Sequence, residues 1–248
     1  MKIVQMENWE RREHFEFYSK CSTPHYCIAF NIEVSKLLAF TRANHISFYY
    51  SLIYLCTKAM NSVDEFLLEI QDGVLMKADR RIACFTDLRK GETVFHMVTL
   101  PCEGDIVEFA QKARTESENN PQPVYALEGS GEPQIIFSCV PWVDMTVCTN
   151  ERDYNDPNLK DDTTPILVWG KYTEQDGKYK INMTLDVNHR LIDGYYVHCR
   201  RLSRSIGPEE AVYLSFFNLK GKIIHGQMVP VLFYQVSYFK QSHSPPFS

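Results

Sequence analysis

The chain has 248 residues, of which 44% are hydrophobic and 23% charged, so it is long enough to bury one substantial core. Its formal net charge is -5 and no run of lysine or arginine is longer than a pair, which argues against nucleic acid as a partner. No stretch approaches the roughly 20 apolar residues that span a bilayer, and the segment 1–14 has charges but no apolar signal region. We therefore expect a cytosolic protein with no membrane partner.

The cysteines are scattered, with no Cys-x-x-Cys pair and no histidine at zinc-finger spacing. An even number of cysteines permits disulfides, but a chain of this size without a signal region is expected to keep them reduced. We therefore predict free thiols and no metal site. The eight cysteines are Cys21, Cys27, Cys56, Cys84, Cys102, Cys139, Cys148 and Cys199.

The first strong element signal is a buried helix over 47–61, where apolar and aromatic residues occupy nearly every face without glycine or proline. A hairpin follows, because the runs 66–70 and 74–76 flank Asp72-Gly73, a favoured tight-turn pair. A further helix is predicted over 106–117. Strand-like runs occur at 123–127, 134–140 and 145–149.

The last part of the pattern is a strand pair followed by a helix. The run 166–172 is separated by Asp176-Gly177 from a strand that alternates from Tyr179 onward. A helix is then expected over 195–206, ending at Gly207-Pro208. Helices and strands mix without a regular βαβ repeat, which predicts an α+β fold, a two-layer sandwich with a mixed, largely antiparallel sheet. No glycine-rich phosphate loop and no Gly-x-Ser-x-Gly elbow occurs, so nucleotide hydrolysis and serine-hydrolase chemistry lack support.

His189 is the candidate catalytic residue that the alternation itself picks out. It is the last member of an otherwise apolar row, which comprises Tyr179, Ile181, Met183, Leu185 and Val187. Partial desolvation at that position favours a neutral imidazole, which can accept a proton near neutral pH. Taken alone, the pattern more often describes a histidine that is packed and satisfied in the core.

Four ordered blocks resemble one family. They are the run Trp9-Glu10-Arg11-Arg12-Glu13-His14-Phe15-Glu16-Phe17-Tyr18, then Pro141-Trp142-Val143, Gly170-Lys171-Tyr172, and the motif His189-x-x-x-Asp193-Gly194. In this order and spacing they closely resemble chloramphenicol acetyltransferase, from about residue 9 to residue 206. The resemblance implies a chloramphenicol acetyltransferase-like catalytic domain over 1–207, followed by an extension over 208–248 to which no role is assigned.

The resemblance also implies a reaction and an assembly. Acetyl-CoA is the co-substrate, no cofactor is permanently bound, and the small acceptor is chloramphenicol or a related hydroxyl compound. His189 removes the proton from a primary hydroxyl, and the alkoxide attacks the acetyl thioester directly. The assembly implied is a homotrimer whose active sites lie between subunits.

Individual residues take roles from the matching positions of the family. Asp193 pairs with Arg11 and holds the turn around His189, although composition alone would make both solvated surface charges. Phe17, Tyr18 and Leu88 match acceptor-pocket positions, where Phe17 could equally be core. Lys171 and Tyr172 match residues near the coenzyme A end, and Trp142 is expected to pack rather than to recognise a ligand.

This chain departs from the family pattern at several polar positions. Val147 stands in place of the serine whose hydroxyl stabilises the oxyanion, and the loss of one such donor costs roughly a hundred- to a thousandfold in rate. If 145–149 is a strand, Thr149 shares the face of Val147 and could replace it directly or through a water. Asn188 replaces a second histidine and is expected to point away from His189. The remaining replacements are Val168 for threonine, Leu88 for phenylalanine and Pro24 for cysteine.

Two alternatives remain open at this stage. The string Asn188-His189-Arg190-x-x-Asp193-Gly194 is close to the signature of dihydrolipoamide acyltransferase catalytic domains, which share the fold and the histidine base. The second alternative is a non-catalytic or weakly active trimeric binder, in which Val147 and Val168 record lost chemistry. Binding of coenzyme A without turnover would favour the binder.

Overall fold

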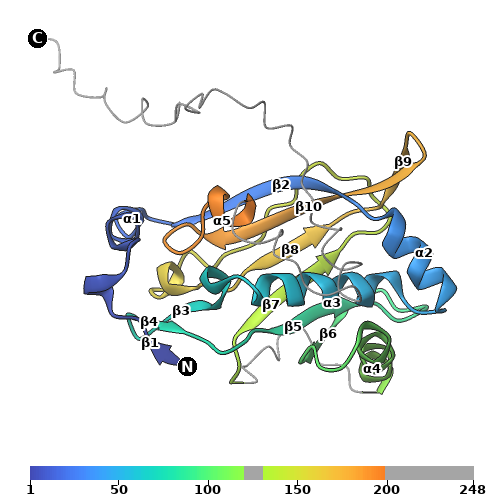
Figure 1. Ribbon diagram of the computed structural model, residues 1–248, viewed down its shortest axis with the longest axis horizontal. Helices are drawn as coiled ribbons and strands as arrows, with labels where there is room; N and C mark the ends of the chain where they lie inside the picture. The colour runs from blue at the N-terminus through green and yellow to red at the C-terminus, as the bar shows by residue number, and fades with distance from the viewer. Residues whose placement is uncertain (120–130, 199–248) are drawn as a thin grey trace, which may run out of the picture.

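A mixed seven-stranded sheet forms the centre of the molecule (Figure 1). The computed structural model describes residues 1–119 and 131–198. The strand order is β2 (His25–Glu33), β10 (Lys178–Asn188), β8 (Ile166–Trp169), β7 (Gln134–Cys139), β5 (Ile82–Asp87) and β6 (His96–Leu100), with β9 (Thr173–Gln175) paired to β10. Only β5, β7 and β8 run parallel to one another, and the other pairs are antiparallel.

Helices cover one face of this sheet, as Figure 1 shows for the long helix α3 in front of β5 and β7. The main helices are α2 (Ser35–Ala43), α3 (Phe48–Asn61) and α4 (Ile106–Asn119). The Ser47 side chain caps α3 by accepting a hydrogen bond from the Tyr50 backbone nitrogen. The helical layer on a mixed, largely antiparallel sheet confirms the predicted α+β sandwich.

Shorter elements complete the described chain. Two short helices lie near the end of β10 (Figure 1): α1 (Arg12–Tyr18) and α5 (Gly194–His198). A small antiparallel sheet is formed by β1 (Lys2–Ile3), β4 (Val74–Lys77) and β3 (Leu68–Gln71). Three single 3-10 turns are η1 (Met6–Asn8), η2 (Asp64–Leu67) and η4 (Leu159–Asp161).

The two hairpins predicted from Asp-Gly pairs are both present. Asp72 and Gly73 have φ of 50° and 75°, and Asp176 and Gly177 have φ of 53° and 72°. Positive φ at both central residues defines the turn whose twist matches antiparallel strands, and only residues such as glycine, aspartate and asparagine adopt it readily. The first signal therefore placed β3 against β4 correctly. The second marks the turn between β9 and β10, but the run expected over 166–172 ends at Trp169 as β8, and β9 is a separate strand.

One predicted strand is wrong. Residues 145–149 form no strand, and the whole stretch from 140 to 158 is loop. This stretch contacts side chains on one face of β10, because the Cys148 nitrogen donates to Thr184 Oγ1 and Arg152 pairs with Asp186; it does not pair along a strand. The run 123–127, the helix beyond residue 198, Cys199, the boundary at residue 207 and the extension lie outside the described residues.

The strand β10 is buried on both faces. Its apolar row joins the main core with residues of the helical layer, such as Leu37 and Ile53. The opposite face carries Thr184, Asp186 and Asn188, which are also buried. Loop residues cover them, because the Cys148 backbone nitrogen donates to Thr184 Oγ1 and the Arg152 guanidinium pairs with Asp186.

The described part of the chain contains no helix that is both long and apolar enough to cross a membrane. Its seven cysteines are free thiols.

Candidate active site

His189 lies in a tight turn directly after β10. Its backbone nitrogen donates to the Pro24 carbonyl at 2.7 Å, and the carbonyl of Asn188 accepts from the nitrogens of Leu191 and Ile192 at 3.0 and 3.1 Å. These bonds tie the turn to the residue that precedes β2 and reverse the chain within three residues. The backbone of His189 is thereby held from both sides.

The His189 imidazole is held between two tyrosine rings. The ring centroids of Tyr18 and Tyr26 lie 3.9 and 4.1 Å from it, and the His14 ring meets it edge-on at 5.5 Å. The Nε2 atom of His14 also hydrogen-bonds the backbone carbonyl of His189 at 3.1 Å. The elements that bring these rings together are α1, which carries His14 and Tyr18, and β2, which carries Tyr26.

This environment favours the neutral imidazole. The pKa of His189 is lowered to about 4, mainly by burial and next by the nearby His14; the Asp193 carboxylate opposes this shift and Arg11 adds to it. The pKa of His14 is lowered too, first by burial and then by Arg11. At neutral pH the site therefore holds an uncharged imidazole that can accept a proton, as the position at the end of the apolar row predicted.

Arg11 and Asp193 form the expected ion pair across 182 positions of sequence. The distance between Arg11 Nη1 and Asp193 Oδ2 is 2.8 Å, and the side chains are only 10% and 22% exposed. The other carboxylate oxygen of Asp193 accepts the Tyr195 backbone nitrogen at 2.9 Å and so caps α5. The pair joins the start of α1 to the turn that carries His189, so these are not solvated surface charges.

Asn188 points away from His189, as predicted. Its Nδ2 atom donates to the carbonyls of Lys160 and Asp162 at 2.8 and 2.9 Å, and its Oδ1 accepts the Arg190 backbone nitrogen. The Arg190 guanidinium in turn pairs with Asp161 at 2.8 Å. Asn188 therefore anchors the loop on the far face of β10 and takes no part in the histidine cluster.

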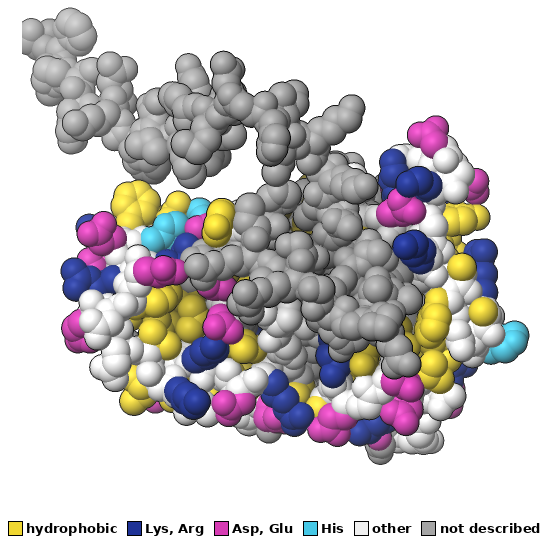
Figure 2. Space-filling model, viewed as in Figure 1, with side chains coloured by type: hydrophobic (Ala, Val, Ile, Leu, Met, Phe, Trp, Pro, Cys, Tyr) yellow, Lys and Arg dark blue, Asp and Glu magenta, His cyan; other side chains and the backbone are white. Residues whose placement is uncertain are grey.

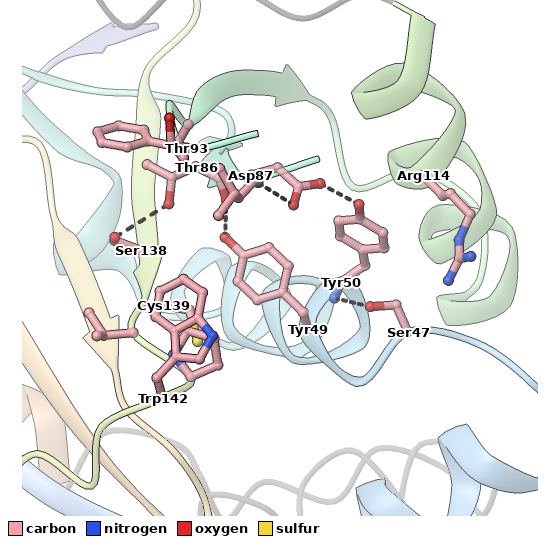
Figure 3. A pocket seen from close by; sticks show the side chains of 14 residues that line it. Ser47, Tyr49, Tyr50, Thr86, Asp87, Thr93, Arg114, Ser138, Cys139 and Trp142 are labelled. Atoms are coloured by element: carbon pink, nitrogen blue, oxygen red, sulfur yellow. Dashed lines mark hydrogen bonds between the residues drawn. The ribbon is translucent and has the colours of Figure 1, made fainter. Parts of the chain in front are cut away.

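A second group of predicted residues lies at the carboxyl ends of β5, β7 and β8. A cavity of about 590 Å³ opens there, and Leu88 and Trp142 line it together with residues from the start of α3 (Figure 3). Trp142 is 71% exposed, so the expectation that it packs was wrong. Its ring stands at the cavity instead, because β7 ends at Cys139 and the chain turns out of the sheet at Pro141.

The residues matched to the coenzyme A end lie beside this cavity. Lys171 is exposed, and its backbone nitrogen donates to the Val143 carbonyl at 2.7 Å. A side chain on Gly170 would meet that carbonyl at 2.5 Å, so glycine is required for this close approach. The Tyr172 ring packs at 5.5 Å from the ring of Phe48.

One chain does not bring all the predicted site residues together. Tyr172 packs against Tyr179 at the start of β10, whereas His189 follows its end, and ten strand residues span roughly 30 Å. In Figure 1, α1 and the tip of β10 lie at one end of the long axis, and β9 and α2 lie at the other. The His189 end thus holds Arg11, Phe17, Tyr18 and Asp193, and the cavity end holds Leu88, Lys171 and Tyr172.

Hydrophobic side chains are exposed at both ends of the long axis in Figure 2. At the His189 end, Phe17 is 61% exposed, which excludes it from the core. At the cavity end, Leu88, Phe95, Trp142 and Val143 are exposed. Each end therefore presents an apolar surface next to its group of site residues.

The positions that depart from the family pattern fall into different environments. Val147 is 54% exposed in the loop, and Val168 is buried on β8 opposite Thr184. Because the loop is not a strand, the argument that Thr149 shares the face of Val147 fails. Pro24 is buried, and its carbonyl rather than its side chain contacts the histidine turn.

Sequence reasoning missed His14 and Tyr26. His14 was part of the quoted N-terminal run, and its helical spacing from Tyr18 places both on one face of α1. Tyr26 is the register partner of Val187, and no local signal shows which strand pairs with β10. The helical spacing could have suggested His14, but Tyr26 required the strand pairing.

The fold is that of acyltransferase catalytic domains. A solved dihydrolipoamide acetyltransferase from Azotobacter vinelandii, at 15% identity, superposes with a TM-score of 0.54 over 74% of this chain and 80% of that chain. A solved chloramphenicol acetyltransferase, at 22% identity, gives a TM-score of 0.72 over 88% of this chain and 98% of that chain. These likenesses define the architecture of the chain.

Sequence comparison identifies the family. The family model for chloramphenicol acetyltransferase matches residues 1–205. Chloramphenicol acetyltransferase from Clostridium perfringens is 28% identical over 198 residues, which cover 79% of this chain and 89% of that protein. Chloramphenicol acetyltransferase 3 from Escherichia coli is 26% identical over 199 residues, which cover 77% and 89%. The chain belongs to the chloramphenicol acetyltransferase family and is an acyltransferase.

Proposed function

We propose that this protein is an acetyl-CoA-dependent O-acetyltransferase that acts on the primary hydroxyl of chloramphenicol or of a related small acceptor. The observation that carries the proposal is the uncharged His189 imidazole, clamped between Tyr18 and Tyr26 at the end of β10. A general base must be unprotonated at working pH and fixed in position. His189 meets both conditions, and the relatives named for this activity share the family.

In the proposed reaction, His189 accepts the proton of the acceptor hydroxyl. The alkoxide oxygen then attacks the thioester carbonyl of acetyl-CoA and forms a tetrahedral intermediate. Its collapse breaks the carbon–sulfur bond, and the proton held by the imidazole passes to the leaving thiolate, which leaves as coenzyme A thiol. No acyl-enzyme forms, and Arg11 and Asp193 act only by holding the turn.

The site is completed by a second copy of the chain. The two groups of site residues lie at opposite ends of the sheet, so the His189 end of one subunit meets the cavity end of the next. Such a head-to-tail contact closes into a ring when the rotation is right, and the family resemblance suggests three subunits. We further propose that the enzyme works in the cytoplasm without a permanent cofactor, with residues 1–207 as its catalytic domain.

A binder without catalysis is the second candidate. One observation favours it: both altered positions carry apolar side chains. Val147 cannot donate a hydrogen bond, and Val168, on β8, is buried and equally apolar. In that case coenzyme A binds but the thioester is not consumed.

The deciding experiment is thiol release from acetyl-CoA in the presence of chloramphenicol. We expect acceptor-dependent release by the wild-type chain and at least a thousandfold loss in His189→Ala, since this variant lacks the base on which the proposed mechanism depends. Binding of acetyl-CoA should survive in that variant. Binding without release by the wild-type chain would instead support the non-catalytic candidate.

A further inference from the structure

A carboxylate stands in the wall of the cavity at the carboxyl ends of β5 and β7. Asp87, the last residue of β5, lines this space opposite Trp142 (Figure 3). The proposed chemistry does not use this side chain. Chloramphenicol carries no positive charge for it to meet, so its presence calls for a physical account.

Three neutral donors fix the orientation of the Asp87 carboxylate. Oδ2 accepts the Tyr50 hydroxyl and the Ser117 hydroxyl, the latter at 2.6 Å, and Oδ1 accepts the Leu88 backbone nitrogen at 2.8 Å. Donors therefore reach both oxygens and fix the carboxylate in one orientation. Oδ1 retains a lone pair after accepting only one of these bonds.

A buried histidine supports this arrangement from behind. His96 Nε2 lies 3.0 Å from Ser117 Oγ, and the Ser117 proton is already used towards Asp87. Ser117 must therefore accept from Nε2–H, which assigns the His96 tautomer. The hydrogen bonds from His96 to Ser117 and from Ser117 to Asp87 thus point their donors towards the carboxylate, and they bring no formal charge to it.

Asp87 has no counter-ion among residues 1–119 and 131–198. No lysine, arginine or histidine of these residues forms an ion pair with it. The one cation that lines the cavity is Arg114 on α4, which is exposed to solvent and therefore strongly screened. A partly buried carboxylate held only by neutral donors attracts a cation from the bound ligand.

The rest of the cavity wall suits an organic cation. The rings of Tyr49, Tyr50, Phe95 and Trp142 contribute to it. Aromatic faces attract ammonium groups through the ring quadrupole, and more so where water is excluded. Aromatic walls with a single fixed carboxylate form a combination that recognises cationic amines.

We propose that this cavity selects small molecules that carry a protonated amine, with Asp87 as the counter-ion. The inference rests on the proposed function only in calling this ligand the acetyl acceptor. It implies that a cationic hydroxyl or amino compound is preferred over the neutral antibiotic. Asp87 is then a specificity residue of the acceptor site.

The test uses a matched pair of ligands, chloramphenicol and its deacylated free amine. Both carry the same nitrophenyl ring and hydroxyls, but only the amine is charged at pH 7. By calorimetry on the full chain, we expect the amine to bind at least about tenfold tighter than chloramphenicol. Asp87→Asn should remove most of this preference while changing the affinity for chloramphenicol by less than about threefold.

Arg114→Gln provides a second variant, at an exposed position where misfolding is not expected. It should strengthen amine binding about two- to threefold, because a repulsive charge is removed from the cavity lining. Asp176→Asn, which makes the same charge change as Asp87→Asn but in a distant hairpin turn, should change nothing. The proposal is overturned if chloramphenicol binds as tightly as the amine. It is also overturned if Asp87→Asn and Arg114→Gln both leave the preference for the amine unchanged.

The binding and transfer assays separate the two proposals. Amine binding that depends on Asp87, without acetyl transfer to any acceptor, would uphold this inference and refute the proposed function. Efficient acetylation of chloramphenicol that is indifferent to Asp87→Asn, with no tighter binding of the amine, would do the reverse.

Discussion

At the scale of single residues, His189 shows how packing keeps an imidazole uncharged near neutral pH. Two tyrosine rings and an edge-on histidine surround the imidazole, and burial is the largest cause of its lowered pKa. In the folded chain protonation is therefore disfavoured relative to the unfolded chain. The histidine costs stability as the pH falls below about 6.5 and towards 4, and it does not do so above that range.

The pH dependence of kcat/KM follows from the same feature. We expect a plateau from about pH 6 to 8 and an acid limb with an apparent pKa well below 6.5. His14→Gln should move that limb to higher pH, because the charge of His14 lowers the pKa of His189. The two histidines interact, so the measured value belongs to the pair. Rates of thiol release measured across this pH range test the prediction. An acid limb at 6.5 in both the wild-type chain and His14→Gln would contradict it.

Val147→Ser is the residue-scale test of the altered oxyanion position. The valine is exposed in a loop, so the substitution should cost little stability. If the new hydroxyl reaches the intermediate, kcat should rise about tenfold or more with KM nearly unchanged, since the donor acts only in the transition state. Val94→Ser, at another exposed valine, is the matched control. An equal response of the two variants in steady-state assays would show that the position lacks this role.

At the scale of elements, the ion pair between Arg11 and Asp193 fastens α1 to the turn before α5. Loss of one partner removes the opposite charge from a group that stays largely buried. We expect Arg11→Leu or Asp193→Asn to lower the free energy of unfolding by about 3 kcal/mol, the low end for buried pairs because Asp193 keeps some contact with solvent. Denaturant unfolding of both single variants and of the double variant measures it. Strict additivity in that cycle would show that the pair is not coupled.

The elements predicted correctly from sequence are those whose signal lies within a short stretch of residues. The helix over 47–61 and both Asp-Gly hairpins follow from periodicity and turn chemistry, and so does the alternating strand that ends at His189. The strand expected over 145–149 is absent because propensity alone does not place a segment beside a strand, and this segment lies against the face of β10. Tyr26 went unnoticed because its position next to His189 depends on the pairing of β2 with β10. Trp142 was misjudged because its surroundings are set by where β7 ends.

At the scale of the whole molecule, His189 and the cavity lie at opposite ends of the sheet, and this separation is the basis for proposing a site shared between subunits. We expect a trimer of 28.9 kDa chains, about 87 kDa by light scattering. Mixed assemblies give the sharper test. His189→Ala removes the base from one end, and Leu88→Arg fills the cavity at the other.

Each of these two variants should be inactive alone. In co-assembled rings, however, a site that takes His189 from the Leu88→Arg chain and its cavity from the His189→Ala chain is intact. Random mixing of equal amounts should restore about a quarter of the sites. Rings proven to contain both chains but showing no activity would rule out a site shared between subunits.

The separation of the two half-sites along β10 has a consequence for how the enzyme responds to dilution. If the active site is shared between subunits as proposed, a folded single chain contains every required side chain and yet catalyses nothing, because its two ends lie at opposite ends of the sheet. Specific activity should therefore fall with concentration once the subunits part, while circular dichroism remains unchanged. For such a protein, the subunit dissociation constant sets a concentration below which the folded chain is present in the cell but inactive.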